Sequence, residues 1–392
     1  MTRHLLRTVL FRIHWLLGIV AGAVLIVVGV TGGMLSFEDE LLRAMNPGVA
    51  SVQARGEPLS TAALLTRVAA QRPDDAIASL TRSADPTDPA VVGFAPRPDA
   101  AAGPGGRPRG ESRRVDPYDG ALLGELRGEG FFRTTMRLHR WLLAEPDSIG
   151  KHIVGVSSAA LVGFALTGIY LRWPKRRWHS PKAWLAINLR KRGRTLLWQL
   201  HTVVATWLLP VYVVIALSGM WWSYGWYRTG LQAWAGIEVP ARPGAERPGG
   251  SPSAGMQAPP PAAAPPVAPV AFDAAEAWRA FETAAPAWSE ATLRWPGPEG
   301  IVQVRYFDAD PAHERAANTL ELDAATLAPT KHERYDDASW RKQLVGSMFA
   351  LHRGSFFGVG GIVVWMLASF AMPLFAITGW WLWYARRQLR VR

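Results

Sequence analysis

The chain has 392 residues, of which 49% are hydrophobic, and a formal net charge of +12. Lys and Arg are concentrated in short segments beside long apolar stretches, which argues against nucleic-acid binding. The absence of cysteine excludes disulfides, thiolate metal sites, cysteine-held iron–sulfur clusters and haem attached through a C-x-x-C-H motif. Many of the 19 tryptophans lie at the ends of the apolar stretches, as in the aromatic belts of membrane proteins.

Four apolar stretches are long enough to cross a bilayer, so we expect a mainly α protein with a four-helix transmembrane bundle. The first span, residues 1–37, is too long for the apolar core of a cleaved signal peptide. The second lies in 138–173 behind a short helix that enters the membrane, the third in 195–226, and the fourth with its tail in 341–392. The loop 174–194 has eight Lys or Arg and no acidic residue, which predicts a cytoplasmic loop and cytoplasmic termini.

The two remaining segments, 38–137 and 227–340, are polar and contain helix and strand signals. Each is predicted to fold as a small external α+β domain. The first segment has a helix signal at 59–71 and strand signals that follow it, and the second repeats this order after 272–285. Residues 241–270 are mostly Pro, Ala and Gly, so we expect a disordered linker there.

An internal repeat organises the chain, because each half consists of a span, an external segment and a second span. One histidine in the first span of each half lies at the same separation from a following Thr-Gly or Ser-Gly pair. A second histidine, in a Leu-His-Arg triplet, precedes the second span of each half. A repeat of this kind predicts a pseudo-two-fold axis along the membrane normal, which places equivalent residues opposite each other. The corresponding residues are His14 with Thr31-Gly32, His201 with Ser218-Gly219, Leu138-His139-Arg140 and Leu351-His352-Arg353.

A titratable ring in a membrane-spanning segment is costly, so its default interpretation is functional. The predicted topology puts His14 and His201 at the cytoplasmic depth and His139 and His352 at the external depth. Two imidazoles that face each other in a four-helix bundle are suited to a b-type haem. We therefore expect two bis-His b-type haems, one near each membrane face, with the four histidines as axial ligands of the haem iron.

Several alternatives accompany this prediction. Arg140 and Arg353 are candidates to neutralise haem propionates, and His152 is an alternative to His139 as the outer ligand. A zinc or copper site on the same histidines ranks second, because the spans lack the acidic ligands that such sites often add. His313, like the remaining histidines, is predicted to lie at the surface.

These motifs together resemble the PepSY-associated transmembrane family, and Val115–Gly120 resembles the strand and turn of its PepSY-like external domain. The resemblance implies haem ligation by the same four histidines. Similar members include the inner-membrane ferric-siderophore reductases of Gram-negative bacteria, which implies a multi-pass protein of the bacterial inner membrane. The motifs that carry the resemblance are Ile13–Gly18, Thr31-Gly32, Leu138–Leu142, Leu351–Gly354 and Phe357-Gly358.

The function that follows is transmembrane electron transfer from a cytoplasmic or quinol donor to a periplasmic ferric siderophore, with release of Fe(II). Periplasmic siderophore-binding or iron-binding proteins are expected as further partners. Trp222, Tyr224, Trp340 and Arg341 are candidates to line the substrate surface. Two alternatives are a haem-free membrane module that binds a periplasmic peptide or protease, and a b-type electron carrier for a non-siderophore acceptor.

Overall fold

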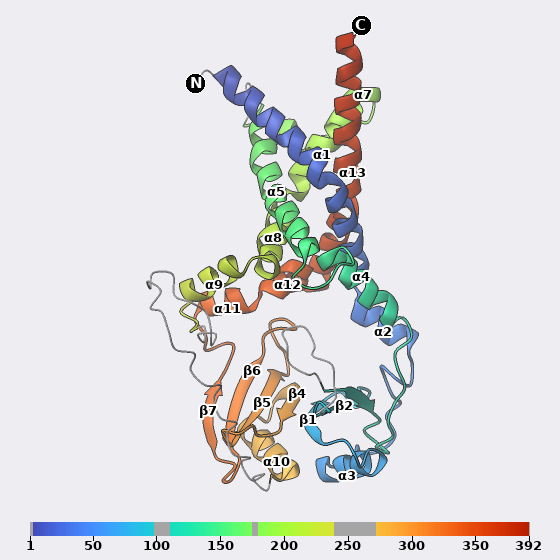
Figure 1. Ribbon diagram of the computed structural model, residues 1–392, viewed down its shortest axis with the longest axis vertical. Helices are drawn as coiled ribbons and strands as arrows, with labels where there is room; N and C mark the ends of the chain where they lie inside the picture. The colour runs from blue at the N-terminus through green and yellow to red at the C-terminus, as the bar shows by residue number, and fades with distance from the viewer. Residues whose placement is uncertain (1–2, 98–109, 175–178, 239–271, 392) are drawn as a thin grey trace, which may run out of the picture.

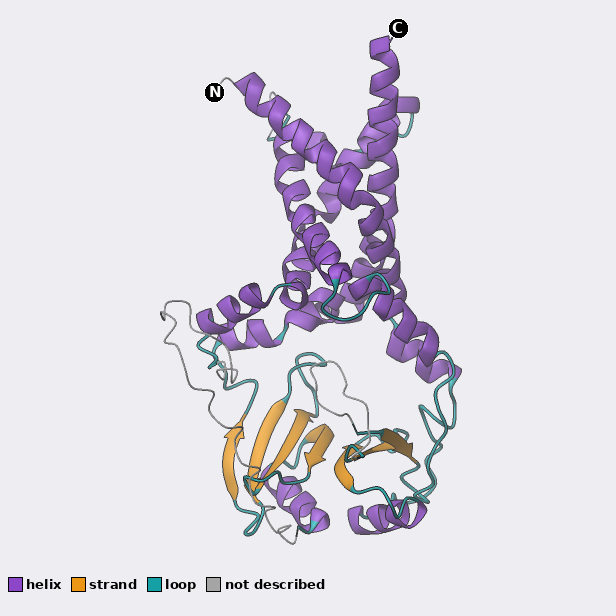
Figure 2. Ribbon diagram, viewed as in Figure 1, coloured by secondary structure: helices purple, strands orange, loops and turns teal. Residues whose placement is uncertain are grey.

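The computed structural model describes residues 3–97, 110–174, 179–238 and 272–391. A bundle of long helices forms one end of the molecule, and a sheet with its covering helices forms the other (Figures 1 and 2). Both ends of the chain lie at the tip of the bundle that points away from the sheet (Figure 1). The predicted linker at 241–270 lies outside the described residues.

Four helical segments among the described residues are long and apolar enough to cross a membrane. They are α1 (Arg3–Leu35), α5 (Ile149–Arg172), the run formed by α7 (Gly193–Gln199), a π-helical turn (Leu200–Val204) and α8 (Ala205–Ser223), and α13 (Gly358–Val391). Helix α1 packs along α13 and α5, and α5 also packs along α8. The prediction of a mainly helical, multi-pass membrane protein is confirmed.

The fourth span is shorter than predicted, because a helix ends directly after His352 and a new one begins at Gly358. Helix α11 (Trp340–Gly346) and helix α12 (Met348–Arg353) precede α13 as separate short helices, with one 3-10 turn (Ser355–Phe357) between α12 and α13. Gly354 and Gly358 have φ values of +89° and +67°, which helical residues with a side chain rarely adopt. The apolar pattern runs through this point, so the sequence indicated one continuous helix where the two glycines end one and start another.

The strands of the two external segments form one antiparallel sheet, in the order β3-β2-β1-β4-β5-β6-β7. The prediction that the two segments fold as separate domains is therefore wrong, because their strands share one sheet. Strand β1 pairs with β4, and Leu80 lies opposite Leu293. Pairing these strands removes two exposed sheet edges and joins two small apolar faces into one core. The strands are β1 (Ile77–Ser83), β2 (Ala90–Phe94), β3 (Ser112–Val115), β4 (Trp288–Arg294), β5 (Ile301–Asp308), β6 (Asn318–Asp323) and β7 (Pro329–Glu333).

Helices cover one face of this sheet only. Helix α3 (Thr61–Gln71) and helix α10 (Ala274–Ala284) lie on the side away from the bundle (Figure 1). Ser60 and Asp273 cap them by accepting hydrogen bonds from backbone N–H groups of the first turn. Alternate strand residues point to the covered face and are fully buried there. The other face, toward the bundle, carries a row of polar side chains in paired positions, Thr81, Thr292, Arg305 and Thr319. The core includes Leu64, Val68, Leu80, Val92, Phe281, Leu293, Val304, Tyr306 and Leu320.

Short helices lie between the bundle and the sheet (Figure 1). They are α2 (Glu38–Met45), α4 (Glu129–Trp141) and α9 (Gly225–Trp234), while α6 (Pro181–Leu185) lies in the basic loop. Arg43 of α2 forms an ion pair with Asp88 in the turn between β1 and β2. On the other side, the loop between β5 and β6 reaches α11 and α12 through hydrogen bonds of His313 and Glu314.

His313 is buried, which corrects the prediction that it lies at the surface. Its Nε2 lies 2.8 Å from Ser347 Oγ and 3.0 Å from Tyr335 Oη, and its Nδ1 accepts a hydrogen bond from the Arg315 N–H. Burial lowers the pKa of His313, so the ring is neutral and fixes the β5–β6 loop against α12.

Candidate functional site

The four histidines singled out in the sequence form two facing pairs. His14 of α1 faces His201 of the π-helical turn, with ring centroids 6.4 Å apart and ring planes at 69°. His139 of α4 faces His352 of α12, with centroids 6.2 Å apart and planes at 64°. The partners are those that the sequence predicted. His201 lies in a π-helical turn, which widens the helix locally and is a feature often found at functional sites.

The separation in each pair fits one metal ion held between two imidazoles. Two metal–nitrogen bonds of about 2 Å, with about 1 Å from each nitrogen to its ring centre, add up to about 6 Å. The observed separations are 6.4 Å and 6.2 Å. The first pair lies on two of the spans, and the second lies on α4 and α12, which pack against the spans α1 and α8. A helix bundle offers the apolar environment that a planar cofactor needs.

A hydroxyl group from a neighbouring helix holds Nδ1 of every ring. Each hydroxyl also donates its one hydrogen to the carbonyl four residues earlier, in Thr31 to Val27, Thr167 to Gly163, Ser218 to Val214 and Thr378 to Leu374. The hydroxyl oxygen is therefore left to accept a hydrogen bond from the ring. The Nδ1–oxygen distances are 2.7 Å for His14 and Thr167, 3.1 Å for His139 and Thr31, 2.9 Å for His201 and Thr378, and 3.0 Å for His352 and Ser218.

The outer pair, His139 and His352, gives independent support for the tautomer with the proton on Nδ1, whereas His14 and His201 form the inner pair. His139 Nδ1 lies 3.0 Å from the Val28 carbonyl oxygen, and His352 Nδ1 lies 3.1 Å from the Ile215 carbonyl oxygen. A carbonyl can only accept, so Nδ1 must carry the proton. Nε2 then keeps its lone pair for a metal. This is the arrangement in which a second hydrogen bond orients a metal-binding histidine.

A glycine follows each of these hydroxyl residues and leaves space for the ring. A Cβ atom would lie 3.1 Å from the His139 ring at Gly32 and 3.2 Å from the His352 ring at Gly219. At Gly168 and Gly379 the same distances to His14 and His201 are 3.7 Å and 3.5 Å. The sequence analysis identified Thr31-Gly32 and Ser218-Gly219 as features of the repeat, but it did not reveal that such pairs contact the histidines.

Aromatic side chains fill the bundle beside the pairs. Phe164 lies 5.2 Å from His14 and Phe375 lies 5.8 Å from His201, measured between ring centroids. Tyr212 lies 5.6 Å from Phe375 and donates a hydrogen bond of 2.8 Å to the Ala368 carbonyl. These rings exclude water from the space next to the inner pair.

The two candidate arginines are in different environments. Arg353 donates hydrogen bonds to the Ser36 carbonyl and forms ion pairs of 3.2 Å with Asp39 and Glu40. These carboxylates already balance the positive charge of Arg353, which disagrees with the prediction that it neutralises a haem propionate. Arg140 stacks on Trp141 at 4.7 Å, and no carboxylate of the described residues lies within ion-pair distance of it.

The four predicted substrate residues do not form one cluster. Trp222 lies 5.3 Å from the His352 ring and borders the outer pair. Trp340 and Arg341 instead pack with Trp234, at 5.2 Å and 5.1 Å, where α11 meets α9. Tyr224 contacts Trp226 at the start of α9, with ring centroids 5.9 Å apart.

His152, the alternative outer ligand, is exposed on α5. The ring opposite His352 is that of His139. The structure therefore favours His139 as the outer ligand.

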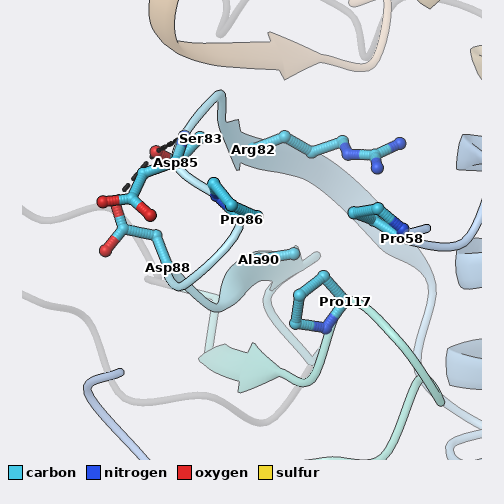
Figure 3. Close-up of a pocket in the computed structure, with 8 residues that line it drawn as sticks. All are labelled: Pro58, Arg82, Ser83, Asp85, Pro86, Asp88, Ala90 and Pro117. Atoms are coloured by element: carbon cyan, nitrogen blue, oxygen red, sulfur yellow. Dashed lines mark hydrogen bonds between the residues drawn. The ribbon is translucent and has the colours of Figure 1, made fainter. Parts of the chain in front are cut away.

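A hollow in the external sheet lies apart from these pairs (Figure 3). Its size, about 20 Å³, is enough for about one water molecule. The charged groups that line it have partners, because Arg82 donates to Thr61 and Leu59 and Asp88 pairs with Arg43. This hollow is not a candidate substrate site.

The sequence matches the family model of the PepSY-associated TM region over residues 11–386. No curated protein matches the chain. The matched range includes most of the first and fourth spans, all of the second and third, both histidine pairs and the external sheet. The chain therefore belongs to the PepSY-associated transmembrane family.

Proposed function

We propose that this protein is a transmembrane electron carrier that binds two b-type haems and reduces a ferric siderophore outside the membrane. The observation that carries the proposal is the pair of facing imidazoles at two levels of the bundle. His14 and His201 would hold the inner haem, and His139 and His352 the outer haem. A bound haem supplies a centre that gains and loses one electron.

The protein side chains hold and orient the ligands in this proposal. Each Nδ1–H is fixed by a hydroxyl oxygen, so each Nε2 keeps its lone pair, with which it would bind the haem iron. Phe164 and Phe375 keep water away from the inner pair. Arg140, which has no carboxylate partner among the described residues, is the better candidate to neutralise a propionate.

The overall reaction moves one electron from a cytoplasmic or quinol donor to an external Fe(III) chelate, which becomes Fe(II). A quinol would give two electrons, release two protons and reduce two chelates. Hard oxygen ligands bind Fe(II) less tightly than Fe(III) because its charge is lower, so the chelate then releases it. No covalent bond to the protein forms or breaks, and the chain needs no acid or base for the iron step.

The proposal also states how the two histidine pairs arose and how the chain is oriented in the membrane. Duplication of a span–external segment–span unit accounts for the like construction of the two pairs. The basic loop and the basic C-terminal end favour cytoplasmic termini in a bacterial inner membrane. The sheet would then lie in the periplasm, where its PepSY-like first part and its second part meet the ferric siderophore and periplasmic iron-binding proteins.

The absorption spectrum of the purified protein and its haem content test this function. We expect two haems per chain, with a Soret band that sharpens and split α and β bands on reduction with dithionite. The variants His14→Ala, His201→Ala, His139→Ala and His352→Ala should each lose one haem. His152→Ala and His332→Ala are matched controls, and both should keep two.

A colourless protein would reject the proposal in favour of a haem-free module for a peptide or protease partner. Two retained haems in His352→Ala would show that the outer pair is wrongly assigned. A haem-loaded, reduced protein that ferric siderophores fail to reoxidise without oxygen would instead be a carrier for another acceptor.

A further inference from the structure

Three arginines lie together on the face of the sheet that the helices leave uncovered. Arg294 is on β4, Arg305 is on β5, and Arg315 is in the loop between β5 and β6. Thr292 lies opposite Arg305, so Arg294 is the diagonal neighbour of Arg305 on the same face. This face points toward the bundle, because α3 and α10 cover the opposite one (Figure 1).

The positive charges of these arginines are not balanced by ion pairs. All three are exposed, and none forms an ion pair with a carboxylate of the described residues. Loss of part of its hydration and the positive charge of Arg315 lower the pKa of Arg305, and Arg294 lowers it further, while Glu290 opposes this shift. Like charges kept this close oppose folding, so an anion that binds among them removes the repulsion.

A chain of ring contacts connects this surface to the outer histidine pair. The Arg315 guanidinium lies 4.1 Å from the centre of the Phe349 ring. Phe349 contacts Trp222 at 6.4 Å, and Trp222 contacts His352 at 5.3 Å. His313 and Glu314 fix the loop that carries Arg315 to α12 and the turn after it, so this connection does not depend on a mobile side chain alone.

We propose that Arg294, Arg305 and Arg315 form the docking site of an anionic ferric chelate, beside the outer histidine pair. The inference rests on the proposed function and names the charge class of its substrate. Fe(III) chelated by several carboxylates or catecholates carries net negative charge. Guanidinium groups bind such oxygen atoms through paired, charge-assisted hydrogen bonds. The site differs from the Trp340–Arg341 cluster, whose rings and cation already pack on Trp234.

Binding of the Fe(III)–EDTA anion to the full-length protein in nanodiscs tests the site without any need for electron transfer. We expect the triple variant Arg294→Gln, Arg305→Gln, Arg315→Gln to bind about tenfold more weakly at low salt, with a flatter salt dependence. Arg305→Lys keeps the charge but loses the paired hydrogen bonds, so it should bind more weakly than the wild type and more tightly than Arg305→Gln. Arg279→Gln on α10, at the covered side of the sheet, is the control and should have no effect.

The basic cytoplasmic loop is the same in every variant, so its contribution to binding cancels in the comparison. Equal affinity of the triple variant and the wild type, with equal melting temperatures, would overturn the proposal. An equal loss in Arg279→Gln, or equal binding of the hexaammineruthenium(III) cation, would also overturn it. Those results would show a general effect of net charge or a site without charge preference.

The binding assay and the haem assay separate the two proposals. A colourless protein that binds the anion through these arginines would keep the docking site and remove the electron-transfer function. A protein with two haems, whose triple variant binds the anion unchanged, would keep the function and remove the docking site.

Discussion

The inner and outer histidine pairs have nearly the same separation but are built from different kinds of helix. His14 and His201 belong to helical segments that are long and apolar enough to cross the membrane, and His201 lies in the π-helical turn of its segment. His139 and His352 belong to short helices, α4 and α12, that end beside the bundle and turn back into it. Leu142 and Gly354, both with positive φ, end these helices. An inner site is thus enclosed by spans, whereas the outer site is carried by segments that also contact the external part.

His14 and His139 also differ in how their rings are held. In the described residues, His14 Nδ1 has the Thr167 hydroxyl as its hydrogen-bond partner. His139 Nδ1 has both the Thr31 hydroxyl and the Val28 carbonyl. The backbone therefore supports the ring at the outer site, and a side chain alone supports it at His14. Substitutions can test whether this difference matters.

The largest effect is expected where added volume meets an outer ring. In Gly219→Val, a Cβ atom would lie 3.2 Å from His352 Cε1, and the two methyl groups beyond it would push the ring away. We expect loss of the outer haem and retention of the inner one, measured as about one haem per chain. Gly360→Val in α13 is the control, because a Cβ atom there meets nothing within 4 Å. Two haems in Gly219→Val would show that the ring tolerates displacement.

A smaller effect, unequal between the sites, is expected from the hydroxyl groups. Thr167→Val removes the hydrogen-bond partner of His14, whereas Thr31→Val leaves His139 with the Val28 carbonyl. Loss of an orienting partner typically weakens metal binding by about 10- to 100-fold. We expect an effect of that size in Thr167→Val and a smaller one in Thr31→Val, measured as the rate of haem loss and as the reduction potential of each haem.

Thr167→Ser and Thr31→Ser keep the hydroxyl and should behave like the wild type. Equal effects of the two valine variants would contradict the idea that the backbone supports the outer ring. An unchanged potential and an unchanged rate of haem loss in Thr167→Val would contradict the role of the hydroxyl.

The histidine pairs were predictable because depth in a membrane follows from sequence position and charge. A span of known direction fixes the level of each of its residues, so His14 and His201 could be matched without any coordinates. The hydroxyl–glycine contacts were not predictable in this way. Their role depends on which faces of two helices meet, and an apolar pattern on all sides of a span does not reveal this.

The external part was less predictable for a related reason. Each strand is visible as a local pattern, but pairing of β1 with β4 joins residues more than 200 positions apart. The turns that separate α12 from α13 had a local signal in Gly354 and Gly358. Glycines are also common at packing surfaces of membrane helices, so their sequence alone did not distinguish a break from a contact.

The smallest effect is expected from the ion pairs that attach the outer site to α2. Arg353 follows His352 directly and contacts Asp39 and Glu40, both of which are exposed. Exposed ion pairs contribute about 0.2–1 kcal/mol. Arg353→Gln should therefore raise amide hydrogen exchange in α12 and accelerate loss of the outer haem by a factor of about five or less. The inner haem should be unaffected, and high salt should reproduce part of the effect in the wild type.

Arg140→Gln is the matched comparison, because Arg140 occupies the equivalent position after His139 but stacks on Trp141. An arginine that neutralises a propionate should change the potential of the outer haem without a change in α12 exchange. We expect this result for Arg140→Gln and the opposite one for Arg353→Gln. A shift in potential with unchanged exchange in Arg353→Gln would mean that its guanidinium leaves Asp39 and Glu40 for the cofactor. The haem, and not the protein, would then hold the outer site in place. This result would contradict the conclusion that the protein supports the outer site more firmly than the inner one.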